Sequence, residues 1–264
     1  MTRPADPGHG GEPGHARVQV DDQGIATLTI TNARSLNVLS TPVIEDLRRA
    51  LAGLRARAGV RVLVMRGSGE KAFIAGADID EMAGLDGASG RAFISRLRAL
   101  CDDLRDFPAP VIARLAGWCL GGGLEVALSC DLRIGGAGSR YGMPEVRLGI
   151  PSVIHAALLP RLIGASRATW LLLTGEDVDA ATALDWGLIQ KLAEPGELDA
   201  AVDGAARGLA ALGPEAVRQQ KRLLRSWEDV PLSQAMDESV TAFGEAFATG
   251  EPQRFMRAFH DRRR

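Results

Sequence analysis

Cysteine is scarce in this sequence, whose 264 residues include three, at Cys101, Cys119 and Cys130. So few cysteines make neither the disulfide framework of a small secreted protein nor a metal cluster, so we predict no metal site. Their neighbours are mostly apolar, and a free cysteine in such surroundings usually packs as a small hydrophobic residue. We therefore predict three buried free thiols.

A surplus of charge is also missing, because 31 Lys and Arg residues stand against 33 Asp and Glu residues. Nucleic-acid binding needs a basic patch, and no dense basic block precedes the final run Arg262–Arg264, which we interpret as a solvated tail. No apolar run is long enough to span a bilayer. The first residues also lack the apolar stretch of a secretory signal. We expect a soluble cytoplasmic protein with no nucleic-acid or membrane partner.

The composition changes along the chain in a way that predicts three regions. Residues 1–15 are rich in Pro and Gly and poor in apolar side chains, so we predict a disordered tail in which His9 and His15 are solvated. Residues 16–197 mix strand and helix patterns, and residues 198–264 have mainly helical patterns. This order predicts one α/β catalytic core followed by a C-terminal helical region.

Local patterns place the main elements. A hairpin is predicted over residues 17–30 with its turn at Gln23-Gly24, and Thr41-Pro42 marks a helix start. The short apolar runs VRVLVMRG, PVIARLAG and DLRIGG are typical of strands buried on both faces. Residues 91–107 have helical periodicity. One further strand, GLIQKL, is expected among helices over residues 166–173, 179–186, 198–212, 214–227, 232–248 and from 252 onward.

Small residues follow the first buried strand, at Ala75, Gly76 and Ala77 in the segment KAFIAGADI. Small side chains let a ligand approach the backbone, and free N–H groups there could bind an oxygen that gains negative charge. The segment is equally consistent with a tight strand-to-helix turn in which Asp78 caps the helix.

Three glycines, Gly121 to Gly123, follow the second buried strand and begin an amphipathic stretch. This arrangement places free N–H donors at a helix N-terminus, where the helix dipole also favours negative charge. No Gly-Lys-Ser/Thr follows, which excludes a P-loop, and the third glycine of the dinucleotide motif is missing. Glu125 lies one turn into this helix among apolar residues, so it is either on a solvated face or buried for a reason.

A second glutamate, Glu145, follows Pro144 in the segment YGMPEVRLGIP. Taken alone, it could be an ordinary exposed loop acid paired with Arg147. Each of these segments is a weak signal by itself, and their order along the chain carries the information.

The ordered series KAFIAGADI, GWCLGGGLEVALSCDLRI, YGMPEVRLGIP, LPRLIGASRA and LLLTGEDVDAATALDWGLIQKL resembles the enoyl-CoA hydratase/isomerase (crotonase) superfamily, over about residues 17–261. The resemblance implies an α/β fold built as a spiral of ββα units with a C-terminal helical trimerisation region. It therefore implies a homotrimer or a dimer of trimers. Phe243, Phe247, Phe255 and Phe259 recur at helical spacing in that region.

The resemblance also implies roles for individual residues. The oxyanion-hole N–H groups match Ala77 and Gly122, and the two catalytic glutamates match Glu125 and Glu145, which lie 20 positions apart. The positions that match the CoA-binding loops are Leu36, Asn37, Val38, Ala75, Gly76, Asp78 and Ile79. A possible acyl pocket is formed by Trp118, Val153 and His155.

The implied reaction is hydration of a 2-enoyl-CoA thioester, in which Glu125 activates water and Glu145 gives a proton to C2. No cofactor is expected beyond the CoA of the substrate. Alternatives on the same site are an isomerase, a decarboxylase or a hydrolase, and a non-catalytic CoA-ester-binding subunit is a further one. Retention of both glutamates favours hydration, because isomerisation can proceed with one base.

The sequence departs from the family pattern after Pro151. Typical hydratases have several glycines there, whereas this chain has Ser152 followed by Val153, Ile154 and His155. The bulkier residues are expected to reshape the pocket that this loop lines. His155 is interpreted in two ways, as a contact to a polar acyl group or as a packing residue.

Overall fold

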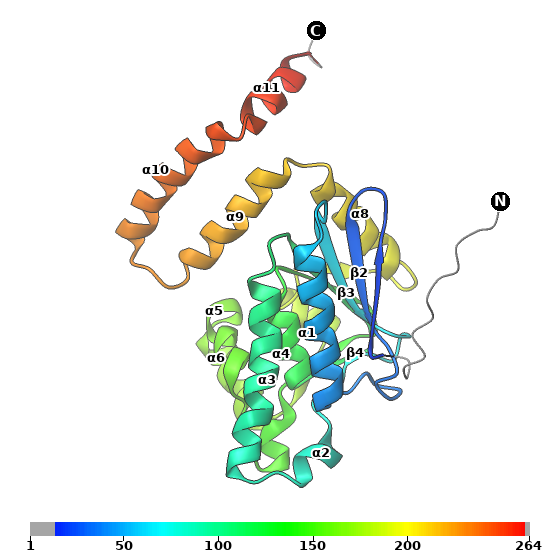
Figure 1. Cartoon of the computed structure of the whole chain (residues 1–264). Helices are drawn as coiled ribbons and strands as arrows, with labels where there is room; N and C mark the ends of the chain where they lie inside the picture. The colour runs from blue at the N-terminus through cyan, green and yellow to red at the C-terminus, as the bar shows by residue number, and fades with distance from the viewer. Residues whose placement is uncertain (1–13, 262–264) are drawn as a thin grey trace, which may run out of the picture.

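Two β-sheets organise residues 14–261, the part of the chain that this computed structural model describes (Figure 1). The larger sheet has six strands, in the order β1 (Ala16–Val20), β2 (Ile25–Ile30), β3 (Val62–Gly67), β5 (Val111–Leu115), β7 (Leu132–Gly136) and β10 (Lys191–Ala193). The smaller sheet has the order β4 (Ala72–Ile74), β6 (Trp118–Leu120), β8 (Arg140–Gly142) and β9 (Asp177–Asp179). Strands β1 and β9 are antiparallel to their neighbours, and the other pairings are parallel.

Strands of the two sheets alternate along the chain. Strand β3 of the larger sheet precedes β4 of the smaller one, β5 precedes β6, and β7 precedes β8. Because β4, β6 and β8 are parallel neighbours, their carboxyl ends lie at one edge of the smaller sheet. The segments that leave these three strands are therefore brought together.

The predicted hairpin is confirmed, since β1 and β2 pair in antiparallel register. The Asp21 carboxylate accepts hydrogen bonds from the N–H groups of Gln23 (3.0 Å) and Ile25 (2.8 Å). Gly24 has φ +79°, a conformation in which glycine carries no steric penalty. The turn is thus set by local sequence.

Helices pack on both faces of the larger sheet. The main core lies between one face and the helices α1 (Thr41–Ala56), α3 (Gly87–Arg105) and α4 (Gly122–Ser129), and α2 (Ile79–Ala83) precedes α3. Leu63 and Met65 of β3 face this core, whereas Val62 and Val64 face a second core under α8 (Leu198–Ala210). This alternation explains why β3 is apolar at successive positions. Helix α8, expected in the C-terminal region, therefore covers the sheet.

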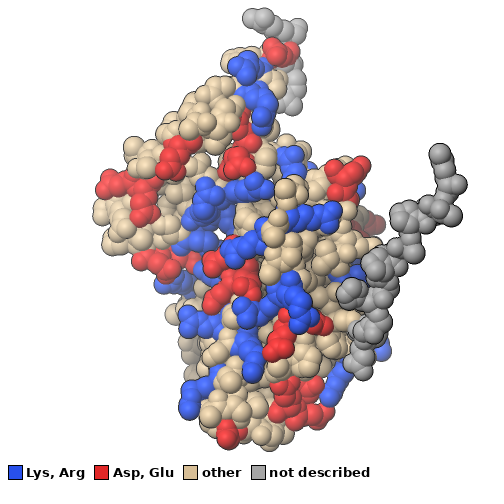
Figure 2. All heavy atoms as spheres, in the orientation of Figure 1, with Lys and Arg blue, Asp and Glu red and all other residues tan. Residues whose placement is uncertain are grey.

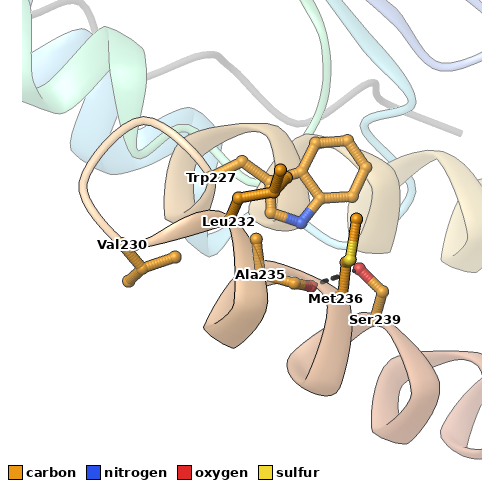
Figure 3. Close-up of a pocket in the computed structure, with 6 residues that line it drawn as sticks. All are labelled: Trp227, Val230, Leu232, Ala235, Met236 and Ser239. Atoms are coloured by element: carbon orange, nitrogen blue, oxygen red, sulfur yellow. Dashed lines mark hydrogen bonds between the residues drawn. The ribbon is translucent and has the colours of Figure 1, made fainter.

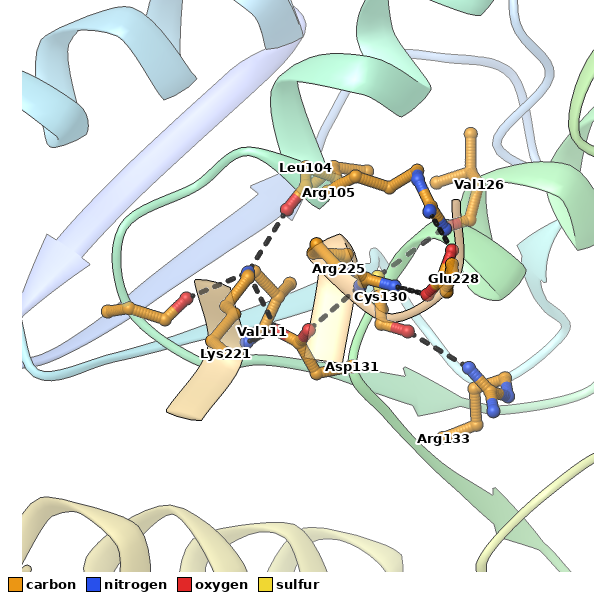
Figure 4. Close-up of polar contacts among 11 residues, drawn as sticks. Leu104, Arg105, Val111, Val126, Cys130, Asp131, Arg133, Lys221, Arg225 and Glu228 are labelled. Atoms are coloured by element: carbon orange, nitrogen blue, oxygen red, sulfur yellow. Dashed lines mark hydrogen bonds and ion pairs between the residues drawn. The ribbon is translucent and has the colours of Figure 1, made fainter. Parts of the chain in front are cut away.

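The helices that leave the body are α9 (Pro214–Ser226), α10 (Leu232–Ala248) and α11 (Glu251–Asp261), and Figure 1 shows α10 and α11 extending from it as an arm. A partly buried ionic network attaches α9 to the body (Figure 4). Lys221 Nζ lies 2.7 Å from one Asp131 oxygen, and Arg225 lies 2.8 Å from the other. Glu228 then joins Arg225 to Arg105 of α3. Removing one partner from such a network leaves a buried charge, which is strongly destabilising.

The remaining elements are short. They are η1 (Pro144–Leu148), η2 (Ile154–Leu158), α5 (Leu159–Ile163), α6 (Ala165–Thr174) and α7 (Ala180–Asp185). The three cysteines are buried and free, as predicted. Within residues 14–261, no group of three or more His, Cys, Asp or Glu side chains could hold a metal ion. Over the same range, no helix is long and apolar enough to cross a bilayer.

The N-terminal boundary differs from the expectation. The His15 N–H donates to Asp46 of α1 at 2.8 Å, and the His15 ring nitrogen Nδ1 lies 3.1 Å from the Asn32 carbonyl oxygen. Order therefore begins before the predicted start at residue 16. His9 and Arg262–Arg264 lie outside the described residues.

Candidate active site

Three loops meet at the carboxyl edge of the smaller sheet. Strand β4 leads into Ala75–Asp78, β6 leads into the glycine triplet at the start of α4, and β8 leads into η1 with Glu145. The parallel order β4-β6-β8 places the triplet between the other two segments. The predicted oxyanion residues and both predicted glutamates are thus carried by these three adjacent loops.

The N–H groups of Ala77 and Gly122 lie close together. A Cβ placed on Gly122 would stand 3.9 Å from the Ala77 nitrogen. The loop of Ala77 is fixed by Leu39, whose N–H donates to the Gly76 carbonyl and whose carbonyl accepts from Asp78, both at 2.9 Å. Neither the Ala77 nor the Gly122 N–H donates to an acceptor within residues 14–261. Both donors are therefore available to a ligand oxygen.

Glu125 is buried, with 3% of its surface exposed. Its Oε1 accepts a hydrogen bond from the Ala156 N–H at 3.1 Å, across from η2. Burial raises the pKa of Glu125 to about 8, the Ala156 N–H opposes that rise, and the charge of Glu145 adds to it. The sequence left open whether Glu125 lies on a solvated face or is buried, and the structure shows that it is buried.

Glu145 is half-buried and lies over the start of α4. A Cβ on Gly121 would stand 2.4 Å from Glu145 Oε1, and Gly121 has φ +52°. The other oxygen, Oε2, accepts from the Ser152 hydroxyl at 2.8 Å. Burial raises the pKa of Glu145 above its usual range, while the Ser152 hydrogen bond opposes the rise. Arg147 is not its partner, because the Arg147 Nε donates instead to the Thr174 carbonyl at 3.4 Å.

Asn37, predicted in a CoA-binding loop, has a fully buried side chain. Its Nδ2 donates to the carbonyls of Ser68 (3.1 Å) and Ala72 (2.8 Å), and the Ser68 hydroxyl donates back to its Oδ1 at 2.9 Å. These bonds hold the loop Leu36–Val38 beside β4, where the Ala75 N–H donates to the Leu36 carbonyl at 3.1 Å. The Asn37 side chain thus supports the loop from inside.

Asp78 and Ile79 open α2 at the edge of the same loop. The Asp78 carboxylate accepts from the N–H groups of Asp80 (3.0 Å) and Glu81 (3.4 Å) and lies 3.2 Å from Arg34 Nη2. Asp78 therefore caps the helix, as one of the two sequence interpretations proposed. Ile79 is 57% exposed, so its side chain is open to a ligand.

Trp118 and His155, two of the three residues predicted for an acyl pocket, line different hollows. Trp118 lines a hollow together with Leu36, Lys71 and Arg140. His155 lines another one, between α3 and the turn that follows α9. Val153 is 40% exposed and precedes η2.

The sequence model of the enoyl-CoA hydratase/isomerase family matches residues 21–264. The chain belongs to this family. A short-chain-enoyl-CoA hydratase from Clostridium acetobutylicum is 34% identical over 241 residues, which cover 91% of this chain and 92% of the relative. A crotonyl-CoA hydratase from Syntrophomonas wolfei is 33% identical over 244 residues, covering 92% and 94%.

Solved structures agree with this assignment. An enoyl-CoA hydratase from Bacillus anthracis superposes with a TM-score of 0.90 at 31% identity, covering 94% of this chain and 96% of that one. Pseudomonas aeruginosa DspI has a TM-score of 0.90 at 29% identity, covering 97% and 98%. The predicted family and the α/β crotonase-type fold are confirmed.

In this enoyl-CoA hydratase/isomerase family member, sequence reasoning missed three residues that contact the predicted site. Ser152 holds Glu145, and the Ala156 N–H holds Glu125. Asp102 of α3 lies 3.2 Å from His155 Nε2. Ser152 and Ala156 belong to the segment noted as a departure from the family pattern, which was the one available signal. Nothing in the local sequence of α3 marks Asp102.

Proposed function

We propose that this chain adds water to 2-enoyl-CoA thioesters to give 3-hydroxyacyl-CoA products, with Glu125 and Glu145 as its acid–base pair. One observation carries the proposal: the buried carboxyl group of Glu125 and the half-buried one of Glu145 lie at the first turn of α4, beside two N–H donors that have no acceptor within residues 14–261. Relatives at similar length are named short-chain-enoyl-CoA hydratase and crotonyl-CoA hydratase, which supports hydration over the other reactions of the fold.

Each part of the site has a step in this reaction. The water oxygen bonds to C3, and the C2=C3 electron pair shifts to give an enolate. The negative enolate oxygen accepts hydrogen bonds from the N–H groups of Ala77 and Gly122. One carboxylate takes the proton that water loses, and the other carboxyl group gives its proton to C2. The product has gained one water, and the pair again holds one proton. An oxyanion-hole donor of this kind contributes about 3–4 kcal/mol to the transition state.

The protonation state of the pair follows from the burial of its carboxyl groups. Both carboxyl groups have raised pKa values, and the one at Glu125 reaches about 8. Two nearby carboxyl groups that both resist ionisation hold one proton between them at neutral pH. Burial raises the pKa of Glu125 to about 8, whereas the family pattern makes Glu145 the donor to C2. We propose that the pair acts as a unit through the shared water, which lets either oxygen complete the transfer.

The CoA moiety is assigned to the hollow beside Leu36 and Trp118. Lys71 on its rim is exposed and makes no ion pair within residues 14–261, so its ammonium is free to meet phosphate. Arg140 on the same rim is paired with Asp177. The loop residues Ala75, Gly76 and Val38 are proposed to face the pantetheine through their backbone. The reaction needs no group beyond the substrate.

The decisive experiment replaces each glutamate by glutamine, which keeps the shape but neither takes nor gives a proton. Glu125→Gln and Glu145→Gln should each lower kcat for crotonyl-CoA by about 10²–10⁴ while retaining CoA-ester binding. The double variant should be little worse than the poorer single one, because groups that act together are non-additive. A matched control is Glu251→Gln, which changes a buried glutamate that accepts N–H bonds at the start of α9.

The outcomes separate the alternatives. Activity that survives Glu125→Gln but not Glu145→Gln would indicate a one-base isomerase. Full activity in both single variants would refute the two-glutamate mechanism. A wild-type chain that binds CoA esters without converting any 2-enoyl-CoA would be the non-catalytic subunit.

We further propose that the alternating strands form turns of a ββα spiral in the core of residues 16–197. In the C-terminal helical region of residues 198–264, the helices that follow α8 are proposed to supply the assembly surface. Apolar side chains along α10 support assembly, since they are exposed at helical spacing: Leu232, Met236, Val240, Phe243 and Phe247. Figure 2 shows mainly uncharged surface along this arm. An exposed apolar stripe of this length marks a protein interface.

The turn between α9 and α10 adds an apolar hollow, lined by Trp227, Val230, Leu232, Ala235, Met236 and Ser239 (Figure 3). We propose that other copies of the chain cover these surfaces in a homotrimer or a dimer of trimers. Val240→Asp, at a position that is 76% exposed, should release smaller species in light scattering. A wild-type monomer at micromolar concentration would contradict the proposal.

A further inference from the structure

The 3-10 turn η2 carries the donor that orients Glu125. The Ala156 N–H is the hydrogen-bond partner of Glu125 Oε1, at 3.1 Å, within the described residues. A buried carboxyl group that loses its donor rotates or holds its proton more tightly, since an unpaired buried oxygen costs about 1–3 kcal/mol. The backbone N–H of His155 also lowers the pKa of Glu125, so the position of η2 matters to the acid–base pair.

The backbone of the turn is strained where it begins. Ile154 has φ +39°, in the left-handed region that β-branched residues rarely adopt. Such a conformation costs on the order of 1–3 kcal/mol and persists where surrounding contacts enforce it. The turn thus needs a restraint from outside its own sequence.

His155 lies between the strained residue and the donor, and it supplies a contact to α3. Its side chain is buried, and its Nε2 stands 3.2 Å from Asp102 Oδ1. Burial lowers the pKa of His155, so the ring is neutral, and with its proton on Nε2 it is within reach of donating to the Asp102 carboxylate. Its Nδ1 has no hydrogen-bond partner within residues 14–261, so the Asp102 contact is its polar anchor.

The cavity that His155 faces does not offer a free cation to a polar acyl group. The charged groups around it are Arg98, Asp102 and Arg105 of α3, Arg161 of α5, and Glu228 and Asp229 of the turn after α9. Each arginine in this set has an acidic partner, at Asp102, Glu228 and Asp229 respectively. Direct recognition of an anionic substrate by this cavity is therefore disfavoured.

We infer that His155 is a positioning residue: by hydrogen bonding to Asp102 it ties η2 to α3 and so holds the Ala156 N–H against Glu125. The inference rests on the proposed function, in which Glu125 is one half of the acid–base pair. The His155–Asp102 tether also takes the place of the glycines that this loop lacks, because a tether can enforce a backbone conformation that glycine would adopt without strain.

The test compares four single variants. His155→Ala and Asp102→Ala remove the tether from either side, and His155→Gln keeps a donor at nearly the same reach. Asp103→Ala is the matched control, because it breaks a 2.7 Å ion pair from the same helix α3 to Arg48 without touching η2. All four are assayed for kcat, KM, the pH profile of kcat and thermal stability.

We expect both tether variants to lower kcat by about 10–100-fold, the scale of a small misplacement of a catalytic group, with KM changed less than about threefold. His155→Gln should recover most of that loss, and Asp103→Ala should leave kcat unchanged. Because the Ala156 N–H lowers the pKa of Glu125, its displacement should move the basic limb of the profile to higher pH. Combining His155→Ala with Asp102→Ala should cost no more than the worse single change.

Lower thermal stability with unchanged kcat and unchanged pH profile in both tether variants would overturn the inference and leave His155 as packing. Equal losses in His155→Gln and His155→Ala, with normal activity in Asp102→Ala, would also overturn it. Titration of the Glu125 carboxyl group followed by carbon-13 NMR measures the effect of the tether on the pKa of Glu125 without any turnover. A wild type that hydrates nothing refutes the proposed function, whereas an unaltered Glu125 titration in His155→Ala refutes the tether.

Discussion

Replacing Glu125 by glutamine should make the protein more stable above neutral pH while it destroys activity. Glutamine fits the same space, and its Oε1 can still accept from the Ala156 N–H that now holds the carboxyl group at 3.1 Å. The variant lacks the ionisation that burial opposes. The wild-type chain therefore carries a stability cost that the variant does not.

The size of this cost follows from linkage. Glu125 has a folded-state pKa of about 8, above its ordinary value of 4.5. Below pH 4.5 both the folded and the unfolded chain hold the proton, so there is no cost. As the pH rises towards 8, the unfolded chain releases a proton that the folded chain keeps. The folding equilibrium constant therefore falls about tenfold per pH unit. The total is on the order of 4–5 kcal/mol, reached near the folded-state pKa.

Chemical unfolding at pH 5 and pH 8 measures this difference. The two proteins should be nearly equally stable at the lower pH, and Glu125→Gln should be more stable by about 3 kcal/mol or more at the higher one. Hydration, followed by loss of enone absorbance, should be about 10²–10⁴-fold slower in the variant. A stability difference that is the same at both pH values would refute the burial of an ionisable Glu125.

Three further predictions concern the same site. The kcat/KM for hydration should fall above about pH 8, because the pair then loses its last proton; a rate that keeps rising would contradict the shared proton. Gly121→Ala should fold by circular dichroism yet lose about 100-fold in kcat, because its Cβ would stand 2.4 Å from Glu145 Oε1; wild-type kcat would refute that placement. Lys71→Ala should raise KM for CoA thioesters about tenfold, the effect of one charged contact to phosphate. The same change should leave N-acetylcysteamine thioesters unaffected, and an equal effect on both would argue against a phosphate contact.

The elements that sequence patterns predicted are those that local rules determine. Asp21 and Gly24 set the turn of the hairpin, and Pro42 lies in the first turn of α1. Strand β3 is apolar at consecutive positions because a core covers each of its faces. Each of these signals lies within a short stretch of sequence. The ordered glycines and glutamates then identified the family, which the comparisons confirm.

The elements that escaped prediction depend on partners far along the chain. Strands β6, β8 and β9 have three residues each, which is too short for periodicity to show. They exist because the smaller sheet pairs them. The Asp102–His155 contact likewise joins α3 to a turn about fifty positions later. Such pairings are properties of the fold, and neither segment carries a local mark of them.

The loop after Pro151 contacts both glutamates although its sequence departs from the family pattern. The missing glycines led us to expect a reshaped pocket, and Ser152 and Ile154 do change the loop's chemistry. Yet the Ala156 N–H still meets Glu125, and the Ser152 hydroxyl gives Glu145 a partner that glycine could not provide. The φ of +39° at Ile154 shows that the backbone is left-handed there although this residue type disfavours that conformation. Departure from a motif therefore signals a change in what holds the geometry, since the contacts of the two glutamates are present.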